Sequence, residues 1–229
     1  MHRYLPFVMI AIGLVSGRSG AQTPPPIEGP VYVATYVEVV PTAVKDAGPL
    51  LRQYRDASRK DGGNVRMEAV QESGRLTRFV LLAIWPDQKA FEAHAKAAHT
   101  TVFREKLKAI QAAPLDERVH RGFSTATPAA TRAASVVVVT HVDVPPPLKD
   151  AVEPMLRQLS EASRNENGNL RFEVGQQANR PNHFTVVELW ADQGAYEAHV
   201  AAQHTRQFRD RLGPMTGALY DERLYRPID

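Results

Sequence analysis

Hydrophobic and polar positions alternate along residues 31–39, where valine or threonine occupies every second position. A period of two is typical of a β-strand with one buried face. Residues 136–144 are equally rich in β-branched side chains and run into consecutive prolines, which cannot continue a strand ladder. The sequence therefore predicts a strand at each of these two distant places.

A helical period follows each strand. Across residues 148–163, apolar and small residues recur at i, i+4, i+7, i+8, i+11, i+14 and i+15, which indicates one buried stripe of a helix. We expect this helix to end near Asn167-Gly168 and its counterpart near Gly62-Gly63. Pro49 and Pro154 lie inside the pattern, so each helix either begins late or bends at its proline.

The remainder of each half predicts a hairpin, two short helices and a final strand. Asp87 and Asp192 follow the hairpins and suit the N-cap of the next helix. In the first half that helix should end near Ala97, and another should run from His99 to about Ile110. The expected strands are 64–71, 76–85 and 116–123, with counterparts at 169–176, 183–190 and 221–226. The order β-α-β-β-α-α-β is the split βαβ pattern of ferredoxin-like α+β folds.

The two halves are copies of one unit. An ungapped comparison of residues 31–118 with 136–223 gives roughly 37 identities in about 88 positions. The most conspicuous residues that recur are Trp85, Asp87, Glu92, His94, His99 and Phe103, which return as Trp190, Asp192, Glu197, His199, His204 and Phe208. We therefore predict a tandem duplication, with units at 31–123 and 135–229 joined by a linker at 124–134.

The N-terminal stretch predicts a cleaved signal peptide over residues 1–21. A weakly basic start, an apolar run at residues 5–15 and the small residues Ser19-Gly20-Ala21 fit such a peptide. The run is shorter than the ~20 residues of a membrane-spanning helix, although retention as an uncleaved anchor is the alternative. Cleavage after Ala21 leaves a Pro-rich spacer at 22–30 and implies an exported protein, periplasmic or secreted.

Charge and cysteine content exclude several partners. Removing residues 1–21 deletes Arg3 and Arg18 and no acidic residue, so the formal charge falls from +3 to +1. This balance gives no electrostatic case for binding nucleic acid or, after cleavage, a membrane. The chain has no cysteine, so its units rely on their cores rather than on disulfides.

Several segments resemble the antibiotic biosynthesis monooxygenase (ABM) family. They are Asn169-Leu-Arg-Phe-Glu173, the strand 184–190 ending in Trp190, and Tyr196-Glu-Ala-His199, followed by His204 and Phe208. The resemblance covers both repeats nearly end to end. It implies two tandem ferredoxin-like units that form an intramolecular dimeric α/β-barrel. It also implies oxidation of a quinol, a related phenol or a polycyclic aromatic with O2, without flavin, metal or other cofactor.

Such chemistry needs a base near neutral pKa inside a pocket that excludes water. Histidine suits this role because its unperturbed pKa is about 6.5. We therefore expect His199 and His94 to act as bases on the helix face toward the sheet, although a buried, satisfied histidine is the alternative. Glu188 matches an acidic position of the family where the first repeat has Ala83, which favours the second unit as the active one.

The substrate-contacting candidates are the aromatic and imidazole side chains around these bases, namely Trp190, Trp85, His204, His99, Tyr196 and Phe91. The tryptophans could equally plug the seam between helix and sheet, and His99 and His204 could instead cap a helix. Five residues of helix rotate two histidines onto different faces and no third ligand is evident, so no metal is expected.

Structural roles and other functions are also open. Arg66 and Arg171, with Glu68 and Glu173 two positions on, are expected to pair across the two units. A non-catalytic exported protein that binds small ligands or serves in stress is the alternative function, because a fold alone does not establish chemistry. Haem degradation is disfavoured, because related enzymes carry tryptophan where histidine stands here. The fused pair could also form a homodimer.

Overall fold

The computed structural model of the chain describes residues 26–125, 136–218 and 220–228. The expected signal peptide, residues 22–25 of the spacer and most of the linker lie outside this part of the chain. Among the described residues, no helix combines the length and apolarity that crossing a membrane requires.

The predicted order of elements is confirmed in both halves. The first unit contains β1 (Val31–Glu38), α1 (Val44–Ser58), β2 (Arg66–Glu72), β3 (Arg78–Trp85), α2 (Gln88–Ala95), α3 (Ala98–Lys108) and β4 (Asp116–Ser124). The second contains β5 (Val136–Asp143), α4 (Lys149–Arg164), β6 (Asn169–Gln177), β7 (His183–Trp190), α5 (Gln193–Ala201), α6 (Gln203–Leu212) and β8 (Asp221–Pro227). Short 3-10 turns precede α1 and α4 and follow α6.

Local signals behave largely as expected. Asp87 and Asp192 cap α2 and α5, each accepting a hydrogen bond from a backbone N–H three residues on. Pro49 and Pro154 lie inside α1 and α4, so neither helix begins after its proline. Both helices end a few residues before the glycines, because the turn into the next strand needs the positive φ of Gly63 and Gly168. The latter has φ +81.

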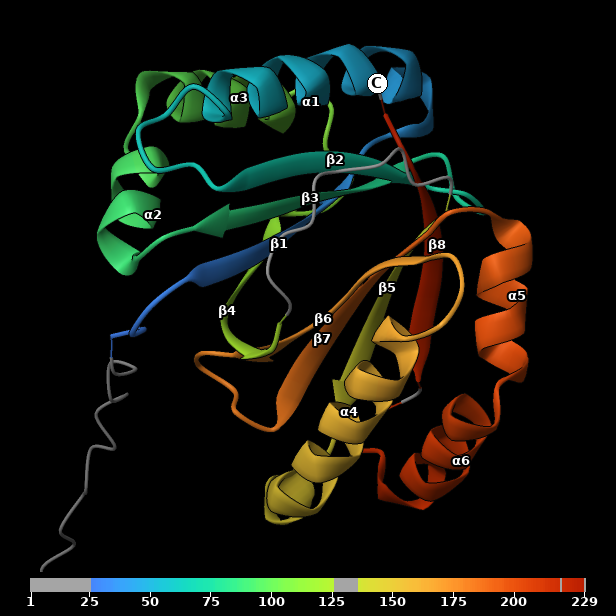
Figure 1. Cartoon of the computed structure of the whole chain (residues 1–229). Helices are drawn as coiled ribbons and strands as arrows, with labels where there is room; N and C mark the ends of the chain where they lie inside the picture. The colour runs from blue at the N-terminus through green and yellow to red at the C-terminus, as the bar shows by residue number, and fades with distance from the viewer. Residues whose placement is uncertain (1–25, 126–135, 219, 229) are drawn as a thin grey trace, which may run out of the picture.

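All eight strands close into one barrel in the order β1-β3-β2-β8-β5-β7-β6-β4 (Figure 1). Each unit contributes an antiparallel four-stranded sheet, and the edge strands of one unit pair with those of the other. The seams join β2 to β8 and β4 to β6. Closure removes the free edges that either sheet would expose alone. The fold is therefore the intramolecular dimeric α/β-barrel expected from the resemblance.

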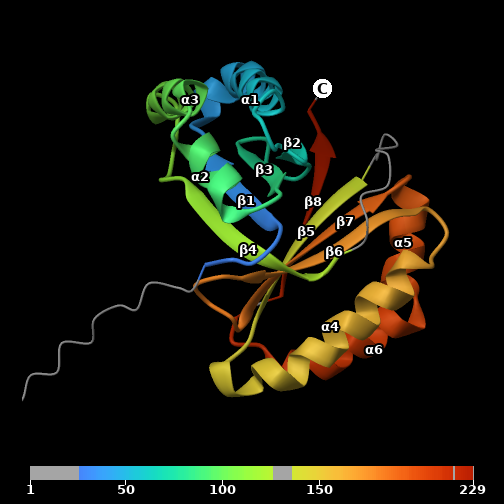
Figure 2. The same cartoon turned by 60° about the vertical axis from the view of Figure 1, so that its left-hand side comes forward.

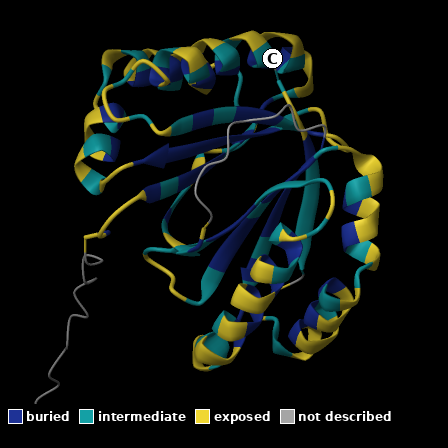
Figure 3. Cartoon of the chain, in the orientation of Figure 1, coloured by how far each residue is buried: buried dark blue, intermediate teal, exposed yellow. Residues whose placement is uncertain are grey.

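The helices lie outside the barrel, with α1 and α3 over the first sheet and α4 and α6 over the second (Figure 2). One hydrophobic core lies between helices and sheet in each unit, and a third lies within the barrel. The strands are largely buried, while the outer helix faces are exposed (Figure 3). Period-two alternation thus places odd and even strand positions in different cores.

The barrel interior is also held by ion pairs between the units. Arg171 on β6 donates to both carboxylate oxygens of Glu68 on β2, at 2.9 and 2.6 Å. Arg66 forms the reciprocal bidentate pair with Glu173. The predicted pairing across the units is confirmed. Glu173 is buried and the other three side chains are partly buried, so removing one member would leave its partner poorly compensated.

Candidate functional site

In the second unit, β7 presents two site candidates to the helices. Glu188 and Trp190 are two residues apart on a strand, so they share a face, and the indole Nε1 donates to Glu188 Oε2 at 2.9 Å. His199 on α5 lies beside them, with Nε2 3.6 Å from Glu188 Oε2. All three side chains are buried. The sequence-predicted residues Glu188, Trp190 and His199 are therefore brought together.

Burial sets the charge state of this group. Loss of hydration raises the pKa of Glu188 from 4.5 to about 8, although the Trp190 hydrogen bond opposes the rise. Burial also lowers the pKa of His199, against the effect of the neighbouring Glu166. Both directions favour the neutral forms near pH 7, a neutral acid beside a neutral imidazole. A neutral pair avoids the cost of two desolvated charges.

A carboxylate outside this buried group links both histidines of the second unit. Glu166, in the turn after α4, places Oε1 2.7 Å from His199 Nδ1 and 2.8 Å from His204 Nε2. The two histidines belong to different helices, because Ala202 between α5 and α6 is extended, with ψ 145°. We call Glu166, His199 and His204 the second triad.

The first unit repeats the arrangement with Asp61, His94 and His99, which we call the first triad. Asp61 Oδ2 lies 2.7 Å from His94 Nδ1 and 3.3 Å from His99 Nε2. Burial lowers the pKa of His94, and Asp61 opposes the shift. Helical rotation does not keep the two histidines of a pair apart, so the expectation that no third ligand lies near them was wrong. Because the chain bends between the paired helices, each histidine pair converges on a third ligand, a carboxylate that helix spacing could not reveal.

One substitution makes the two units differ in shape. In the first unit the Tyr54 ring stacks on Phe103 at 3.9 Å, and its hydroxyl lies 2.8 Å from His94 Nε2. The counterpart of Tyr54 is Leu159, which has no ring to place against Phe208. A cleft of about 360 Å³ lies there between α4 and α6. It is lined by Met155, Gln158, Leu159, His204, Gln207, Phe208, Asp210 and Arg211, so His204 reaches it.

The aromatic side chains that were expected to line a substrate cavity are instead packed in the cores of the two units. Trp85 stacks on His94 at 4.4 Å, and a cavity of about 20 Å³ remains beside them and Phe91. That volume suits about one water molecule, not an aromatic ring. In the second unit Trp190 is fully buried, and the Tyr196 hydroxyl donates to Glu222 at 2.6 Å. Burial and the Glu222 charge raise the pKa of Tyr196, so it is a poor base.

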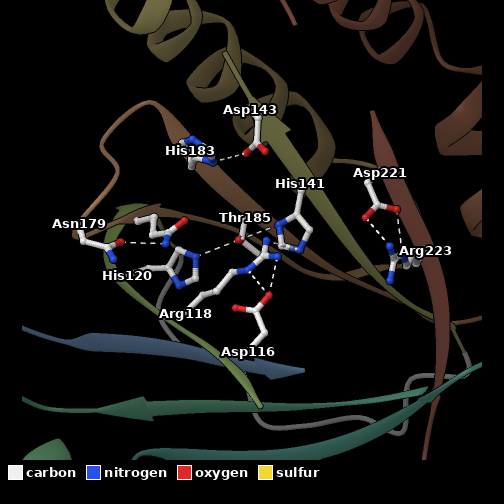
Figure 4. A network of polar contacts seen from close by, with 11 residues as sticks. Asp116, Arg118, His120, His141, Asp143, Asn179, His183, Thr185, Asp221 and Arg223 are labelled. Atoms are coloured by element: carbon white, nitrogen blue, oxygen red, sulfur yellow. Dashed lines mark hydrogen bonds and ion pairs between the residues drawn. The ribbon is translucent and has the colours of Figure 1, made fainter. Parts of the chain in front are cut away.

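Sequence reasoning missed a polar chain inside the barrel (Figure 4). Arg118 donates to His141 Nε2 at 3.0 Å, and Thr185 Oγ1 lies 3.2 Å from His141 Nδ1 and 2.9 Å from His120 Nε2. Burial lowers the pKa of His120 to about 4 and that of His141 to about 3. Alternation along β4 places positions 116, 118 and 120 on one face, and that signal could have found His120.

Comparison with known proteins places the chain in a family. The sequence model of the antibiotic biosynthesis monooxygenase family matches twice, at residues 30–106 and 135–211. The double match agrees with the internal duplication. No curated protein sequence matches the chain.

Solved structures with the same fold span both units. A candidate monooxygenase from Fusobacterium nucleatum has a TM-score of 0.78 at 18% identity, covering 88% of this chain and 93% of its own. A candidate monooxygenase from Lactobacillus acidophilus has a TM-score of 0.73 at 15% identity, covering 88% of this chain and 95% of its own. An anthrone oxidase-like protein has a TM-score of 0.69 at 11% identity, covering 88% of this chain and 92% of its own. Identities this low establish the fold alone. The repeated match to the family model shows that this chain belongs to the antibiotic biosynthesis monooxygenase family.

Proposed function

We propose that the protein is a cofactor-independent monooxygenase that oxidises a small, electron-rich phenolic or polycyclic aromatic molecule with O2. The chemistry is assigned to the second unit. The observation that carries the proposal is the cleft between α4 and α6, which ends on His204. Family membership supports a small-molecule substrate and the use of O2.

The cleft has the size and surface that an aromatic ring requires. Its volume of about 360 Å³ lies in the range of small-molecule sites, which is roughly 300–1,000 Å³. Met155, Leu159 and Phe208 supply an apolar wall, and Gln158 and Arg211 supply polar groups. A flat phenol can place its ring against the wall and its hydroxyl toward the polar side. The first unit has Tyr54 stacked in the corresponding place.

His204 is the proposed base, because it combines access to the cleft with a carboxylate partner. Its Nε2 faces Glu166, which leaves Nδ1 to accept a proton from substrate. Glu166 then stabilises the imidazolium, as a carboxylate does for a catalytic histidine. His199, which was expected to be the base, and Glu188, which was expected to be catalytic, act in this proposal as positioning residues. His199 holds Glu166 from the buried side, and Glu188 lies against the opposite nitrogen of His199.

The reaction balances with O2 as the sole co-reactant. In an anthrone-type substrate, a ring-activated CH2 carbon loses a proton to His204, and the carbanion passes an electron to O2. Recombination and return of the proton give a hydroperoxide, and loss of water from it leaves a carbonyl. The carbon is oxidised by four electrons, one oxygen atom enters the product and the other leaves as water. Delocalisation of the carbanion over a phenolic ring makes the first step accessible without a cofactor.

Export of the protein is a further proposal, and it rests on the N-terminal pattern alone. Expression of the full gene in a Gram-negative host should give a periplasmic protein whose first residue is Gln22. An intact Met1 on the mature protein would contradict the proposal.

The oxidation is tested by O2 uptake of chelator-treated, full-length protein with a panel of hydroquinones and anthrones. We expect His204→Ala to lower the rate about 100-fold, the contribution typical of a general base. His183→Ala is a matched control, because it removes a histidine paired with Asp143 at a distance from the cleft. Uptake unchanged by His204→Ala would refute the assigned base. Saturable binding of these aromatics without uptake would instead establish the alternative, a non-catalytic binding protein.

A further inference from the structure

Two imidazole nitrogens and a carboxylate oxygen converge at one place in each unit. In each triad these atoms lie within 4.8 Å of one another. We infer that each unit binds a divalent transition-metal ion of the zinc class through its triad. The first site comprises Asp61, His94 and His99, and the second comprises Glu166, His199 and His204.

The donor types and distances suit such an ion. Two histidines and one carboxylate are a common zinc ligand set, with bonds of about 2.0–2.2 Å. A tetrahedral ion at those distances separates its ligand atoms by roughly 3.4 Å. The Glu166 oxygen lies 2.7 Å from the His199 nitrogen and 2.8 Å from the His204 nitrogen. The Asp61 oxygen lies 2.7 Å from the His94 nitrogen and 3.3 Å from the His99 nitrogen. An outward movement of about half an ångström at each ligand would admit the ion.

An unsatisfied nitrogen marks the first site. His99 Nε2 is buried and has no hydrogen-bond partner among the described residues, although Asp61 Oδ2 is 3.3 Å away. Buried polar atoms are usually hydrogen-bonded, so a buried nitrogen without a partner is consistent with a bound ion at that place. A metal bound between His99 and Asp61 would satisfy this nitrogen.

The outer partners of the ligands also fit. A histidine that binds metal through one nitrogen commonly donates its other N–H to a nearby acceptor, which fixes the ring. His94 and His199 would bind through Nδ1. The opposite nitrogen, Nε2, lies 2.8 Å from the Tyr54 hydroxyl in His94 and 3.6 Å from Glu188 in His199. His94 therefore has a hydrogen-bond partner on the side away from the ion, while His199 has the Glu188 carboxyl nearby at a longer distance.

Each proposed metal site is partly exposed to solvent and supplies three of the four ligands of a tetrahedral ion. One histidine of each triad is buried, while the side chains of His204 and Glu166 are 28% and 17% exposed. Three protein ligands leave a fourth position for water or a small molecule. In the second unit one of the three ligands, His204, also lines the cleft.

The donor set is retained in both copies of the duplication while its surroundings differ. Tyr54 corresponds to Leu159, and Ala83 corresponds to Glu188, yet each triad keeps two histidines and one carboxylate. The exchange of Asp61 for Glu166 preserves the carboxylate and changes only its length. The inference concerns binding alone. A metal ion in the second triad would take up the Glu166 and His204 atoms on which the proposed base depends, so the oxidation is assigned to the metal-free protein.

The test is titration of full-length, chelator-treated protein with Co²⁺, followed by its visible d–d absorption and by displacement with Zn²⁺. Two ions should bind per chain, one after either His99→Ala or His204→Ala, and none after both changes. His183→Ala, which removes a histidine from a single pair with Asp143, should retain two. Glu166→Gln supplies a second variant that keeps side-chain size, and circular dichroism checks folding. Absence of saturable binding, or equal binding by the double variant, would overturn the inference. Because no substrate is used, failure here leaves the oxidation assay unaffected.

Discussion

Acid should destabilise the barrel through His120, which lies inside it. Its Nε2 is 2.9 Å from Thr185 Oγ1. Burial lowers its pKa from 6.5 to about 4, and the positive charge of Arg118 contributes to the lowering. The groups that face it are Thr185 on β7, Arg118 on its own strand and His141 on β5, while Gly175 on β6 packs against its ring. Arg118 cannot lose its proton and donates to His141. Protonating His120 would add a buried charge beside that cation.

The sign follows from proton binding. Between about pH 6.5 and pH 4 the unfolded chain binds a proton at His120 and the folded chain does not, so lowering the pH favours unfolding. A difference of about 2.5 pKa units, at about 1.36 kcal/mol each, corresponds to about 3–4 kcal/mol, of which roughly 3 kcal/mol is lost by pH 4. The stability that depends on a neutral His120 is fully present above pH 6.5 and is lost as the pH falls toward 4.

Equilibrium urea unfolding at several pH values measures the effect, because the extrapolated free energy of unfolding is obtained at each pH. His120→Gln removes the titrating group but keeps an amide that can bond to Thr185. Burial also lowers the pKa values of His94, His141 and His199, so the difference between wild type and variant is needed to isolate His120. The variant should lose about 3 kcal/mol less than wild type over this range. Parallel pH profiles for the two proteins would refute the reasoning.

Three further substitutions test the fold and the cleft. Leu159→Tyr recreates the first unit's packing and should weaken binding of a naphthalene hydroquinone at least about tenfold by calorimetry, since a ring enters the cleft; unchanged affinity would place the ligand elsewhere. Glu173→Gln removes the buried carboxylate that faces the partly buried guanidinium groups of Arg66 and Arg171, and should cost about 3 kcal/mol in urea unfolding. A loss below about 1 kcal/mol would show the pairs to be dispensable. Gly168→Ala should cost roughly 2 kcal/mol by the same assay, because φ is +81 and the new Cβ would lie 2.5 Å from that of Ala195; Gly62→Ala, which meets no atom within 4 Å, should be near neutral, and equal effects would contradict the argument.

The candidate site was only partly predictable from sequence. Glu188, Trp190 and His199 could each be named as candidates from the sequence, because strand alternation, helix spacing and the family resemblance are visible there. Their role was not predictable, because the burial that neutralises them comes from distant segments. His204 was underrated because its position at the cleft depends on the bend at Ala202.

The sequence by itself determined the element order, the capping aspartates, the duplication and the ion pairs between units. These follow from periods of two and 3.6 residues, and from a repeat that can be read without coordinates. Only the tertiary structure decided that the sheets close through their edges, that each histidine pair meets a carboxylate, and that exchanging Tyr54 for Leu159 accompanies a cleft. The physical reason is that these features depend on contacts between segments far apart in the chain, whose geometry is set by packing and not by local spacing.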